Sequence, residues 1–163
     1  MISVRNIGAP DDIAACLEIY NYYIKNSTAT FEEEPLSLDV FSRRIEKITR
    51  KYPFFVAEND GKVIGFAYLA EFNDRSAYRF TADLSVYLSH DEISRGVGSA
   101  LLAAVEKAGK EIGIKQIISI ITSENEKSLR FHEKHGFVKR GELVDVGYKF
   151  GRPLGVYYYQ KTL

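Results

Sequence analysis

The chain has 163 residues, of which 45% are hydrophobic and 13% aromatic. That length suits one substantial hydrophobic core, so we expect residues 1–163 to form a single globular domain. Lysine plus arginine and aspartate plus glutamate both number 22, which leaves no net charge, and a chain without excess positive charge is a weak candidate for binding nucleic acid or a membrane surface.

Targeting and metal-binding features are not apparent. The first residues, MISVRNIG, lack the apolar stretch of a secretory signal, and no apolar run has the length of about 20 residues that a membrane-spanning helix needs. Cys16 is the one cysteine, and it lies in a helical pattern that predicts burial. A single cysteine supports neither a disulfide framework nor a cysteine-rich metal site. We therefore predict a cytoplasmic protein that holds no metal.

The N-terminal quarter predicts a strand and two helices. Residues 2–7 favour a strand, and Asp11 or Asp12 is expected to cap the first helix. Ser37 is expected to cap the second helix. Apolar residues recur at helical spacing in both segments, as Ile13, Leu17, Tyr20 and Ile24 and then as Leu38, Phe41, Ile45 and Ile48.

The next three segments predict strands. Residues 53–58 and 62–72 are joined by Asn59-Asp60-Gly61, a strong hairpin pattern. Residues 79–89 form the third strand. Its side chains alternate, so that one face carries Thr81, Asp83 and Ser85 and the other carries Leu84, Val86 and Leu88.

The segment EISRGVGSALL, which begins at Glu92, places Gly96 and Gly98 at the start of a helix directly after that strand. Bare backbone at a helix start attracts anions, because its N–H groups are unpaired and the helix dipole is positive there. The segment lacks the Lys and Ser/Thr of a P-loop and the third glycine of a dinucleotide-binding turn. Two interpretations remain: the pyrophosphate loop of an acetyl-CoA-dependent acyltransferase, and a plain tight turn. The buried face of the helix is predicted to be Val97, Leu101, Val105, Ala108 and Ile112.

The C-terminal part continues the alternation of strands and helices. Residues 115–122 are apolar nearly throughout and predict a central strand covered on both faces. A short helix from residue 126 is expected to end at Gly136, and residues 137–160 supply the last strands. This order of elements favours an α/β layered fold with a partly parallel sheet.

Several of these segments resemble the GNAT acetyltransferase superfamily. SVYLSHDEISRGVGSALL resembles its central motif, and ENEKSLRFHEKHGFVKRG resembles the motif that follows. Four further segments resemble, more narrowly, the group of phosphinothricin, methionine sulfoximine and methionine sulfone acetyltransferases: ATFEEEP, PFFVAENDGKVIGFAY, RSAYRFTADLSVYL and VGYKFGRPLGVYYYQ. The resemblance covers nearly the whole chain.

The resemblance implies the GNAT fold: a central mixed, mostly antiparallel sheet with a splayed parallel strand pair and helices on both faces. It implies that acetyl-CoA lies between the splayed strands, residues 82–88 and 115–122, with its pantetheine arm on the backbone of Val86 and Leu88. The cofactor-binding residues implied are Val86, Tyr87, Leu88, Ser94, Arg95, Gly96, Val97, Gly98, Ser99, Asn125 and His132.

The chemistry implied is attack of a neutral amine on a thioester, which needs a base because an amine is mostly protonated at neutral pH. Asp83 stands where the group carries Glu, so we expect it to act through water; the alternative is a hydrogen-bonding acid on a polar strand face. The backbone N–H of Leu88 is the candidate donor to the oxyanion. His132 takes the position from which many family members bond or protonate the departing thiolate, whereas His90 and His135 are expected at the surface.

The acceptor is expected to be a small-molecule amine held by residues before and within the third strand. Arg75 and Arg79 are candidates for a carboxylate or phosphinate, because the guanidinium pairs with two oxygens, and surface ion pairing is the equal alternative. Tyr78, Thr81 and Phe31 are the other candidates for this pocket. The resemblance also implies a homodimer, with KFGRPLG and Tyr157–Tyr159 assigned to core packing and a dimer contact.

Three departures from the group's pattern bear on function. Asp83 replaces Glu, Ile93 stands where the loop has Gln or Arg, and Gly155 replaces an acidic residue. The function expected is acetyl transfer from acetyl-CoA to an amino-acid-like acceptor. The alternatives are an acetyltransferase for another amine, such as a polyamine or a protein N-terminus, and a CoA-binding sensor without a base.

Overall fold

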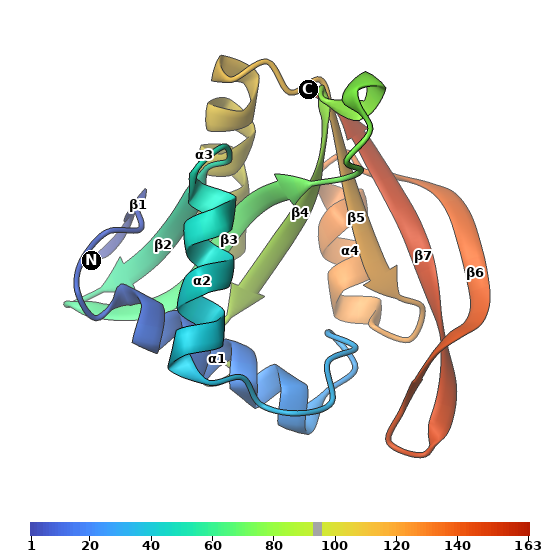
Figure 1. Cartoon of the computed structure of the whole chain (residues 1–163), viewed down its shortest axis with the longest axis horizontal. Coiled ribbons are helices and arrows are strands. Elements are labelled where there is room, and N and C mark those ends of the chain that lie inside the picture. The colour runs from blue at the N-terminus through green and yellow to red at the C-terminus, as the bar shows by residue number, and fades with distance from the viewer. Residues whose placement is uncertain (93–95) are drawn as a thin grey trace.

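The computed structural model describes residues 1–92 and 96–163 (Figure 1). The strands are β1 (Ile2–Asn6), β2 (Phe54–Asn59), β3 (Lys62–Glu71), β4 (Thr81–Leu88), β5 (Gln116–Thr122), β6 (Val138–Lys149) and β7 (Arg152–Thr162). The helices are α1 (Asp12–Asn26), α2 (Leu38–Thr49), α3 (Val97–Glu111) and α4 (Glu126–Lys134), with a 3₁₀ turn, η1, at Ser76–Tyr78. The expected element order is thereby confirmed.

The seven strands form one sheet in the order β1-β2-β3-β4-β5-β7-β6. Among the described residues, β4 and β5 are the parallel pair, and the other neighbours run antiparallel. The parallel ladder is short: it pairs Thr81 with Gln116, Ala82 with Ile117 and Asp83 with Ile118. Beyond Asp83 the two strands separate, and this opening is visible between β4 and β5 in Figure 1. The mixed sheet with a splayed parallel pair is the architecture expected from the sequence.

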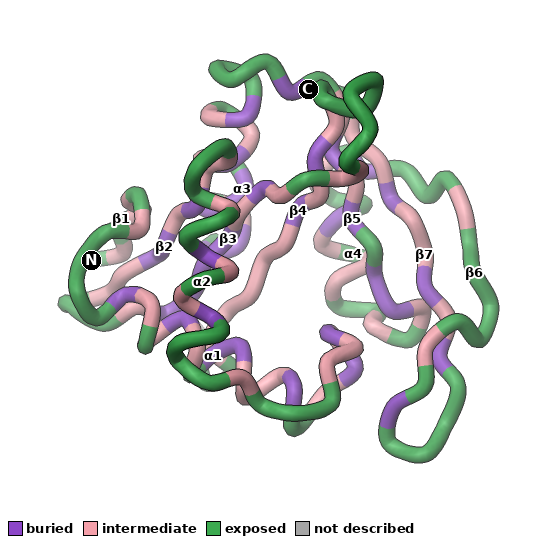
Figure 2. The backbone as a smooth tube through the Cα atoms, in the orientation of Figure 1, coloured by how far each residue is buried: buried purple, intermediate pink, exposed green. Residues whose placement is uncertain are grey.

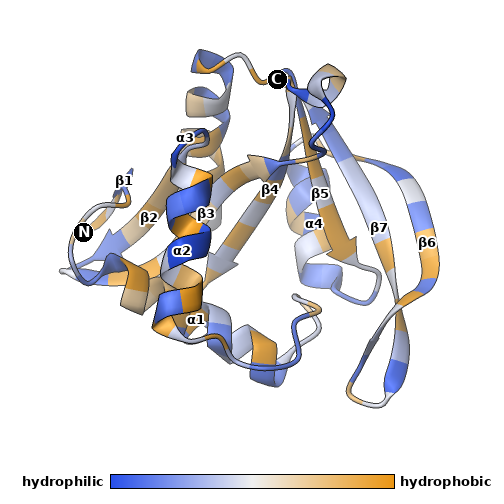
Figure 3. Ribbon diagram, in the orientation of Figure 1, coloured by the Kyte–Doolittle hydropathy of each residue, from blue (hydrophilic) through white to orange (hydrophobic). Residues whose placement is uncertain are grey.

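Helices cover both faces of the sheet, and each face has its own core. On one face α1 and α2 pack on β2 and β3 around Phe41, Phe54 and Phe66. On the other, α3 packs around Leu101, Val105 and the inner side chains of β4 and β5. Figure 2 shows burial concentrated in the middle strands, whereas β6 at the edge is exposed along most of its length. Figure 3 shows apolar and polar residues alternating around α2, as a helix resting on a sheet requires.

Three of the local turn and cap predictions are confirmed. Asp60 and Gly61 both have positive φ, 49° and 81°, which is the backbone that a two-residue hairpin turn needs. The Ser37 side chain accepts a hydrogen bond of 3.3 Å from the amide of Val40 at the start of α2. Gly136 has a φ of 88° just after α4, where a residue with a Cβ would be strained.

The first helix departs from a simple cap. Asp11 occupies the cap position of α1 without a side-chain hydrogen bond. Asp12 instead is buried, accepts 2.9 Å hydrogen bonds from the amides of Gly8 and Ala9, and pairs with Arg5 at 2.7 Å. The Arg5 guanidinium holds the pKa of Asp12 down to about 2. This carboxylate therefore joins β1, the following turn and α1.

Two burial predictions were wrong. Ile112 is 51% exposed, because α3 ends at Glu111 and the chain turns before reaching the core again at Ile114. Ile120 is 47% exposed, so β5 is not covered on both faces. The helices α1 and α2 lie over β2 and β3 and leave this face of β5 open. No helix among the described residues is long and apolar enough to cross a membrane.

Candidate active site

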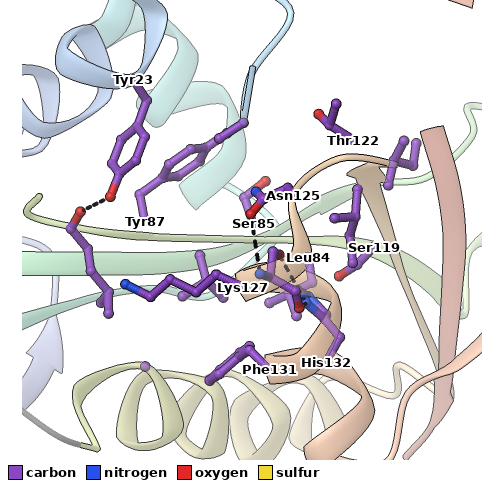
Figure 4. A pocket seen from close by; sticks show the side chains of 17 residues that line it. Tyr23, Leu84, Ser85, Tyr87, Ser119, Thr122, Asn125, Lys127, Phe131 and His132 are labelled. Carbon is purple, nitrogen blue, oxygen red and sulfur yellow. Dashed lines mark hydrogen bonds between the residues drawn. The ribbon is translucent and has the colours of Figure 1, made fainter. Parts of the chain in front are cut away.

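A pocket of about 230 Å³ occupies the opening between β4 and β5 (Figure 4). Strand β4 contributes Leu84 through Leu88, and β5 contributes Ser119 through Thr122. Helix α1 and the segment after it close one side with Tyr23 and Ala29. The first turn of α3 and helix α4 with its cap residue close the other with Gly98, Asn125, Lys127, Ser128, Phe131 and His132.

Backbone groups of β4 face this opening. The amide of Ser89 donates a 2.8 Å hydrogen bond to the carbonyl of Ile64 on β3. Because bonded and non-bonded pairs alternate along an antiparallel ladder, Tyr87 and Ser85 also bond β3, and Val86 and Leu88 direct their N–H and C=O groups away from it. Those groups point toward β5, which has already diverged. An extended ligand placed here would be bonded as an added strand.

The opening joins two chemically different halves. Leu84, Val86 and Leu88 point to the face of α3 and α4, where they pack in the core cluster with Ile117 and Ile121. Ser85 and Tyr87 point to the face of α1, where Tyr68 and Tyr87 pack against that helix. A ligand that passes between β4 and β5 would contact both faces of the sheet.

The two glycines before α3 have separate local reasons. Gly96 has a φ of 90° and is the cap residue of α3, a conformation that favours glycine. Gly98 is buried in the pocket wall, where a Cβ would lie 3.1 Å from Cε2 of Phe131. The backbone there is therefore close to the pocket and uncovered by a side chain. Ile93, Ser94 and Arg95, which the sequence analysis also named, lie outside the described residues.

The start of α4 borders the same pocket. Asn125 caps this helix, since its Oδ1 accepts a 3.3 Å hydrogen bond from the amide of Ser128. Asn125 also lines the pocket, where its side-chain NH₂ could donate to a ligand. Lys127 extends across the pocket in Figure 4, and it brings to the site a positive charge that was not among the residues named from the sequence.

Asp83 lies at the point where the parallel ladder ends. It is opposite Ala70 on β3 and Ile118 on β5, and its side chain shares the α1 face of β4 with Ser85. Its Oδ1 is buried and has no hydrogen-bond partner among the described residues. Burial raises the pKa of this carboxyl to about 6. The carboxyl does not line the pocket itself; it is two residues from Ser85, which does.

His132 is buried beneath the opposite half of the pocket. Its Nδ1 lies 2.7 Å from the carbonyl oxygen of Ser128, and since a carbonyl only accepts, Nδ1 carries the proton. In the neutral ring Nε2 is therefore an acceptor. Burial lowers the pKa of His132 and favours that neutral form. A hydrogen bond donated by His132 to a thiolate would require the disfavoured cation.

Other residues named from the sequence are placed as follows. Val97 is buried in the core. The hydroxyl of Ser99 lies 2.9 Å from Nε2 of His135, whose Nδ1 is 2.7 Å from the carbonyl of Phe131. His135 is therefore a half-buried link between α3 and α4 rather than a surface residue. His90 is exposed, as expected, and stacks on Tyr22.

The proposed acceptor residues do not line this pocket. Arg75, Tyr78 and Arg79 are exposed around η1, and Arg79 bonds the carbonyl of Ser76 at 3.0 Å. Thr81 is at the paired end of β4, on the same face as Asp83. Their role in binding an acceptor stays a prediction.

The segment between α1 and α2 is held from three directions. Lys149, at the end of β6, is 1% exposed and donates 2.8 Å hydrogen bonds to the carbonyls of Ser27 and Thr30. The hydroxyl of Thr122 donates to the carbonyl of Thr28. Glu124 accepts from the Thr28 hydroxyl at 2.7 Å and pairs with Arg152 through two bonds of 2.7 Å.

Phe31 lies in the same segment between α1 and α2, on the side away from the pocket. Its ring lies against Gly147 of β6, where a Cβ would come within 2.2 Å of the ring. Phe31 is therefore packed on the C-terminal hairpin of its own chain. It does not line the pocket between β4 and β5.

The pocket residues that were not anticipated from the sequence include Tyr23, Ser119, Lys127 and Phe131. Tyr23 donates a 2.6 Å hydrogen bond to the carbonyl of Leu88, which is 65 positions away. Lys127 and Phe131 lie in the predicted helix that contains His132. Residues three or four positions apart share a helix face, so both reach the pocket together with Ser128 and His132. Among the described residues, no group of three or more His, Cys, Asp or Glu side chains is placed to hold a metal ion.

Known proteins are similar to this chain in sequence and architecture. A family model described as "Acetyltransferase (GNAT) domain" matches residues 7–155. The chain is 36% identical over 150 residues to a phosphinothricin N-acetyltransferase of Streptomyces viridochromogenes, which covers 92% of this chain and 81% of that protein. It is 32% identical over 163 residues to an L-methionine sulfoximine/L-methionine sulfone acetyltransferase of Pseudomonas paraeruginosa, which covers 99% and 94% of the two chains.

A solved structure adds a bound molecule to the comparison. A GNAT superfamily phosphinothricin acetyltransferase from Sinorhizobium meliloti, in complex with AcCoA, superposes with a TM-score of 0.94 at 35% identity. The superposition covers 99% of this chain and 88% of that one.

Proposed function

The chain belongs to the GNAT acetyltransferase family, and on that premise we propose that it moves the acetyl group of acetyl-CoA to the amine of a small amino-acid-like acceptor, of the phosphinothricin, methionine sulfoximine or methionine sulfone type. The observation that carries the proposal is the opening between β4 and β5, into which Val86 and Leu88 direct their backbone groups. The overall similarity to an enzyme solved with AcCoA supports the same choice of cosubstrate.

In this proposal acetyl-CoA binds the α3 and α4 half of the opening. Its pantetheine amides bond the backbone of Val86 and Leu88, and its phosphates lie by the start of α3, where the amides after Gly96 are free of helical partners. Lys127 and the Asn125 amide complete the polar contacts at the mouth. Apolar contacts from Phe131 and Leu88 enclose the arm.

Asp83 is the proposed base. A carboxyl with a pKa near 6 is ionised at neutral pH and accepts a proton more readily than an exposed aspartate. Because it does not line the pocket, the proton of the amine would reach it through water. The α1 face on which Asp83 lies then receives the acceptor, and the coenzyme occupies the other face.

The oxyanion that forms when the amine attacks needs a donor directed into the opening. The backbone N–H of Leu88 has that direction, and Tyr23 holds the carbonyl of the same residue. His132, with Nε2 unprotonated, accepts a hydrogen bond from the thiol of the released coenzyme.

The acceptor's acidic group is assigned to Arg75 or Arg79, with Tyr78, Thr81 and Phe31 as further contacts. Guanidinium groups favour an anionic acceptor and disfavour a polyamine, whose own positive charges would be repelled. A protein N-terminus is the other enzymatic alternative. The CoA-binding sensor becomes the better description if Asp83 proves dispensable and no amine is acetylated.

A homodimer belongs to the same proposal, with a cytoplasmic setting and neither nucleic acid nor membrane as partner. Large apolar side chains lie exposed along β6 and its hairpin: Leu143, Val144, Val146, Tyr148 and Phe150. Exposed apolar side chains gathered along one edge strand favour contact with another copy. Val144→Glu is expected to convert a dimer to a monomer in light scattering; a wild-type monomer at micromolar concentration contradicts the proposal.

An acetyl-CoA turnover assay over a panel of amines tests the function. The panel contains phosphinothricin, methionine sulfoximine, methionine sulfone, spermidine and a peptide with a free N-terminus. We expect the first three to give the highest kcat/KM. Turnover of spermidine alone, or of the peptide alone, would show that the acceptor is a polyamine or a protein N-terminus instead. CoA binding without turnover of any amine would support the sensor.

A further inference from the structure

Ser119 carries a buried hydroxyl in an otherwise apolar row. It is 2% exposed, and its neighbours on the same face of β5 are the buried Ile117 and Ile121. Its Oγ has no hydrogen-bond partner among the described residues. An unsatisfied hydroxyl in such a position is unfavourable, so its presence calls for a partner that the described residues do not supply.

The hydrogen-bond donors of Tyr159 and His132, which lie near Ser119, are engaged elsewhere. Tyr159, which is directly opposite it on β7, donates its hydroxyl to Glu133 at 2.8 Å. The Nδ1 proton of His132 is bonded to the Ser128 carbonyl. Ser119 nevertheless lines the pocket, and Figure 4 shows its oxygen on the side of β5 where His132 lies. The hydroxyl is therefore available to whatever occupies the pocket.

None of the roles assigned above gives the departing sulfur a hydrogen-bond donor. When the C–S bond of the thioester breaks, both electrons go to sulfur, and the resulting thiolate is stabilised by a hydrogen-bond donor. Neutral His132 presents only an acceptor at Nε2. The Ser119 hydroxyl is on the same face of the sheet, since its ladder partner Tyr159 packs 6.4 Å from the His132 ring, measured between ring centroids.

We propose that Ser119 is a catalytic residue, whose hydroxyl donates a hydrogen bond to the coenzyme sulfur as the C–S bond breaks. The proposal rests on the proposed acetyl-CoA function. Ser119 keeps its own proton: the proton lost by the amine passes through water to Asp83 and on to solvent, and the thiolate takes one from water. The product thiol then lies between Ser119 as donor and His132 as acceptor.

A ligand comparison isolates the sulfur contact. CoA and desulfo-CoA, which lacks only the sulfur, are titrated into wild type and Ser119→Ala by calorimetry at about pH 7 and at about pH 9, below and above the ordinary thiol pKa. We expect CoA affinity to fall about five- to tenfold in Ser119→Ala, more at the higher pH, because a charge-assisted bond is lost. Desulfo-CoA affinity is expected to be unchanged.

Unfolding without ligand separates this role from a structural one. Removing an unpaired buried hydroxyl should leave the melting temperature of Ser119→Ala equal to or above that of wild type. Ser123→Ala, just past the end of β5 and outside the pocket lining, is the control and should bind both ligands as wild type does. Equal affinity losses for CoA and desulfo-CoA, or no loss for either, overturn the assignment.

The same titrations distinguish failure of the proposed acetyl-CoA function from failure of the role proposed for Ser119. If wild type binds neither CoA nor desulfo-CoA, the acetyl-CoA function itself fails. If wild type binds both and Ser119→Ala binds CoA undiminished, the function stands and the role of Ser119 is wrong. Single-turnover acetyl transfer provides the kinetic counterpart, with a reduced rate of C–S cleavage expected for Ser119→Ala.

Discussion

Tyr23 donates a 2.6 Å hydrogen bond from α1 to the carbonyl of Leu88, the last residue of β4. This bond fixes the peptide plane at the end of the strand, where β4 no longer has β5 beside it. Burial raises the pKa of the Tyr23 phenol, so the hydroxyl keeps its proton and stays a donor at neutral pH. The Leu88 carbonyl belongs to the Leu88–Ser89 peptide, so this bond steadies the peptide directly after the one that carries the proposed oxyanion donor, the N–H of Leu88.

Tyr23→Phe should therefore impair catalysis more than stability. Loss of one hydrogen bond is worth about 1 kcal/mol, which predicts a fall of about five- to tenfold in kcat/KM. Tyr22→Phe is the matched control, because Tyr22 packs on His90 and does not line the pocket. Steady-state kinetics on both variants test this; equal effects would remove the special role of the Leu88 peptide.

Asp83→Asn should lower kcat/KM by about 10²–10⁴ at neutral pH if Asp83 is the base. In wild type the rate should rise with pH as a group with a pKa of about 6 ionises. The variant should lose that step, and its residual rate should climb with the fraction of free amine. Asp83→Glu keeps the carboxylate and extends it toward the amine by one methylene, so it should retain most activity. An unchanged pH–rate profile in Asp83→Asn would place the base elsewhere.

Asp83→Asn should also raise the free energy of unfolding at neutral pH. The carboxyl binds its proton more tightly when folded, with a pKa of about 6 against an ordinary 3.8. The free energy of unfolding of wild type should therefore fall as pH rises from below 4 to above 6, because the native state then gives up a proton that it favours. Asp83→Asn should be more stable well above pH 6, by on the order of 3 kcal/mol, and equal to wild type below pH 4. Urea unfolding at several pH values measures it, and a variant destabilised at pH 7 would contradict the burial argument.

Gly98→Val should abolish acetyl-CoA binding. A valine there would meet the ring of Phe131 and fill the pocket wall, since even a Cβ comes within 3.1 Å. Wild type at a hundred times its dissociation constant should gain about 2.7 kcal/mol from the ligand. Gly141→Val on β6, where a Cβ meets nothing within 4 Å, should keep that gain. Thermal shift with and without millimolar acetyl-CoA is the measurement; a preserved shift in Gly98→Val would relocate the coenzyme.

Arg75→Ala and Arg79→Ala test the acceptor site. If either guanidinium pairs with an acidic group, its loss should raise KM for phosphinothricin or methionine sulfone by about tenfold or more and leave neutral amines unaffected. Both side chains are exposed, so stability should change by less than about 0.5 kcal/mol. Equal changes for acidic and neutral acceptors would identify the arginines as surface groups.

Much of the fold was predictable because its determinants are local. The Asp60-Gly61 turn, the Ser37 cap and the Gly136 stop each depend on a few adjacent residues. Burial was predicted less well. Ile120 carries the same side chain as Ile117, yet one is open and the other buried, because the helices on the α1 face lie over other strands. Strand hydropathy contains no record of that placement.

The site was predictable in part for the same reason. Gly98 and His132 stand at recognisable positions beside a strand or in a helix, and the pocket contains both. The Tyr23–Leu88 bond joins residues 65 positions apart, and no sequence period indicates it. Ser119 looked like one small residue in an apolar strand, and its significance came from the absence of a partner in three dimensions among the described residues.

The three-way hold on residues 27–30 has a consequence for how the protein acquires its pocket. Lys149 is separated by 119 and 122 positions from the two carbonyls that it bonds. A chain emerging from the ribosome displays α1 and its following segment long before the lysine that secures them. Closing so long a loop carries an entropic cost, and contacts between residues this far apart in the sequence tend to form late in folding. The hold on residues 27–30, although these residues lie near the beginning of the chain, is therefore completed only after nearly all of the polypeptide has been made.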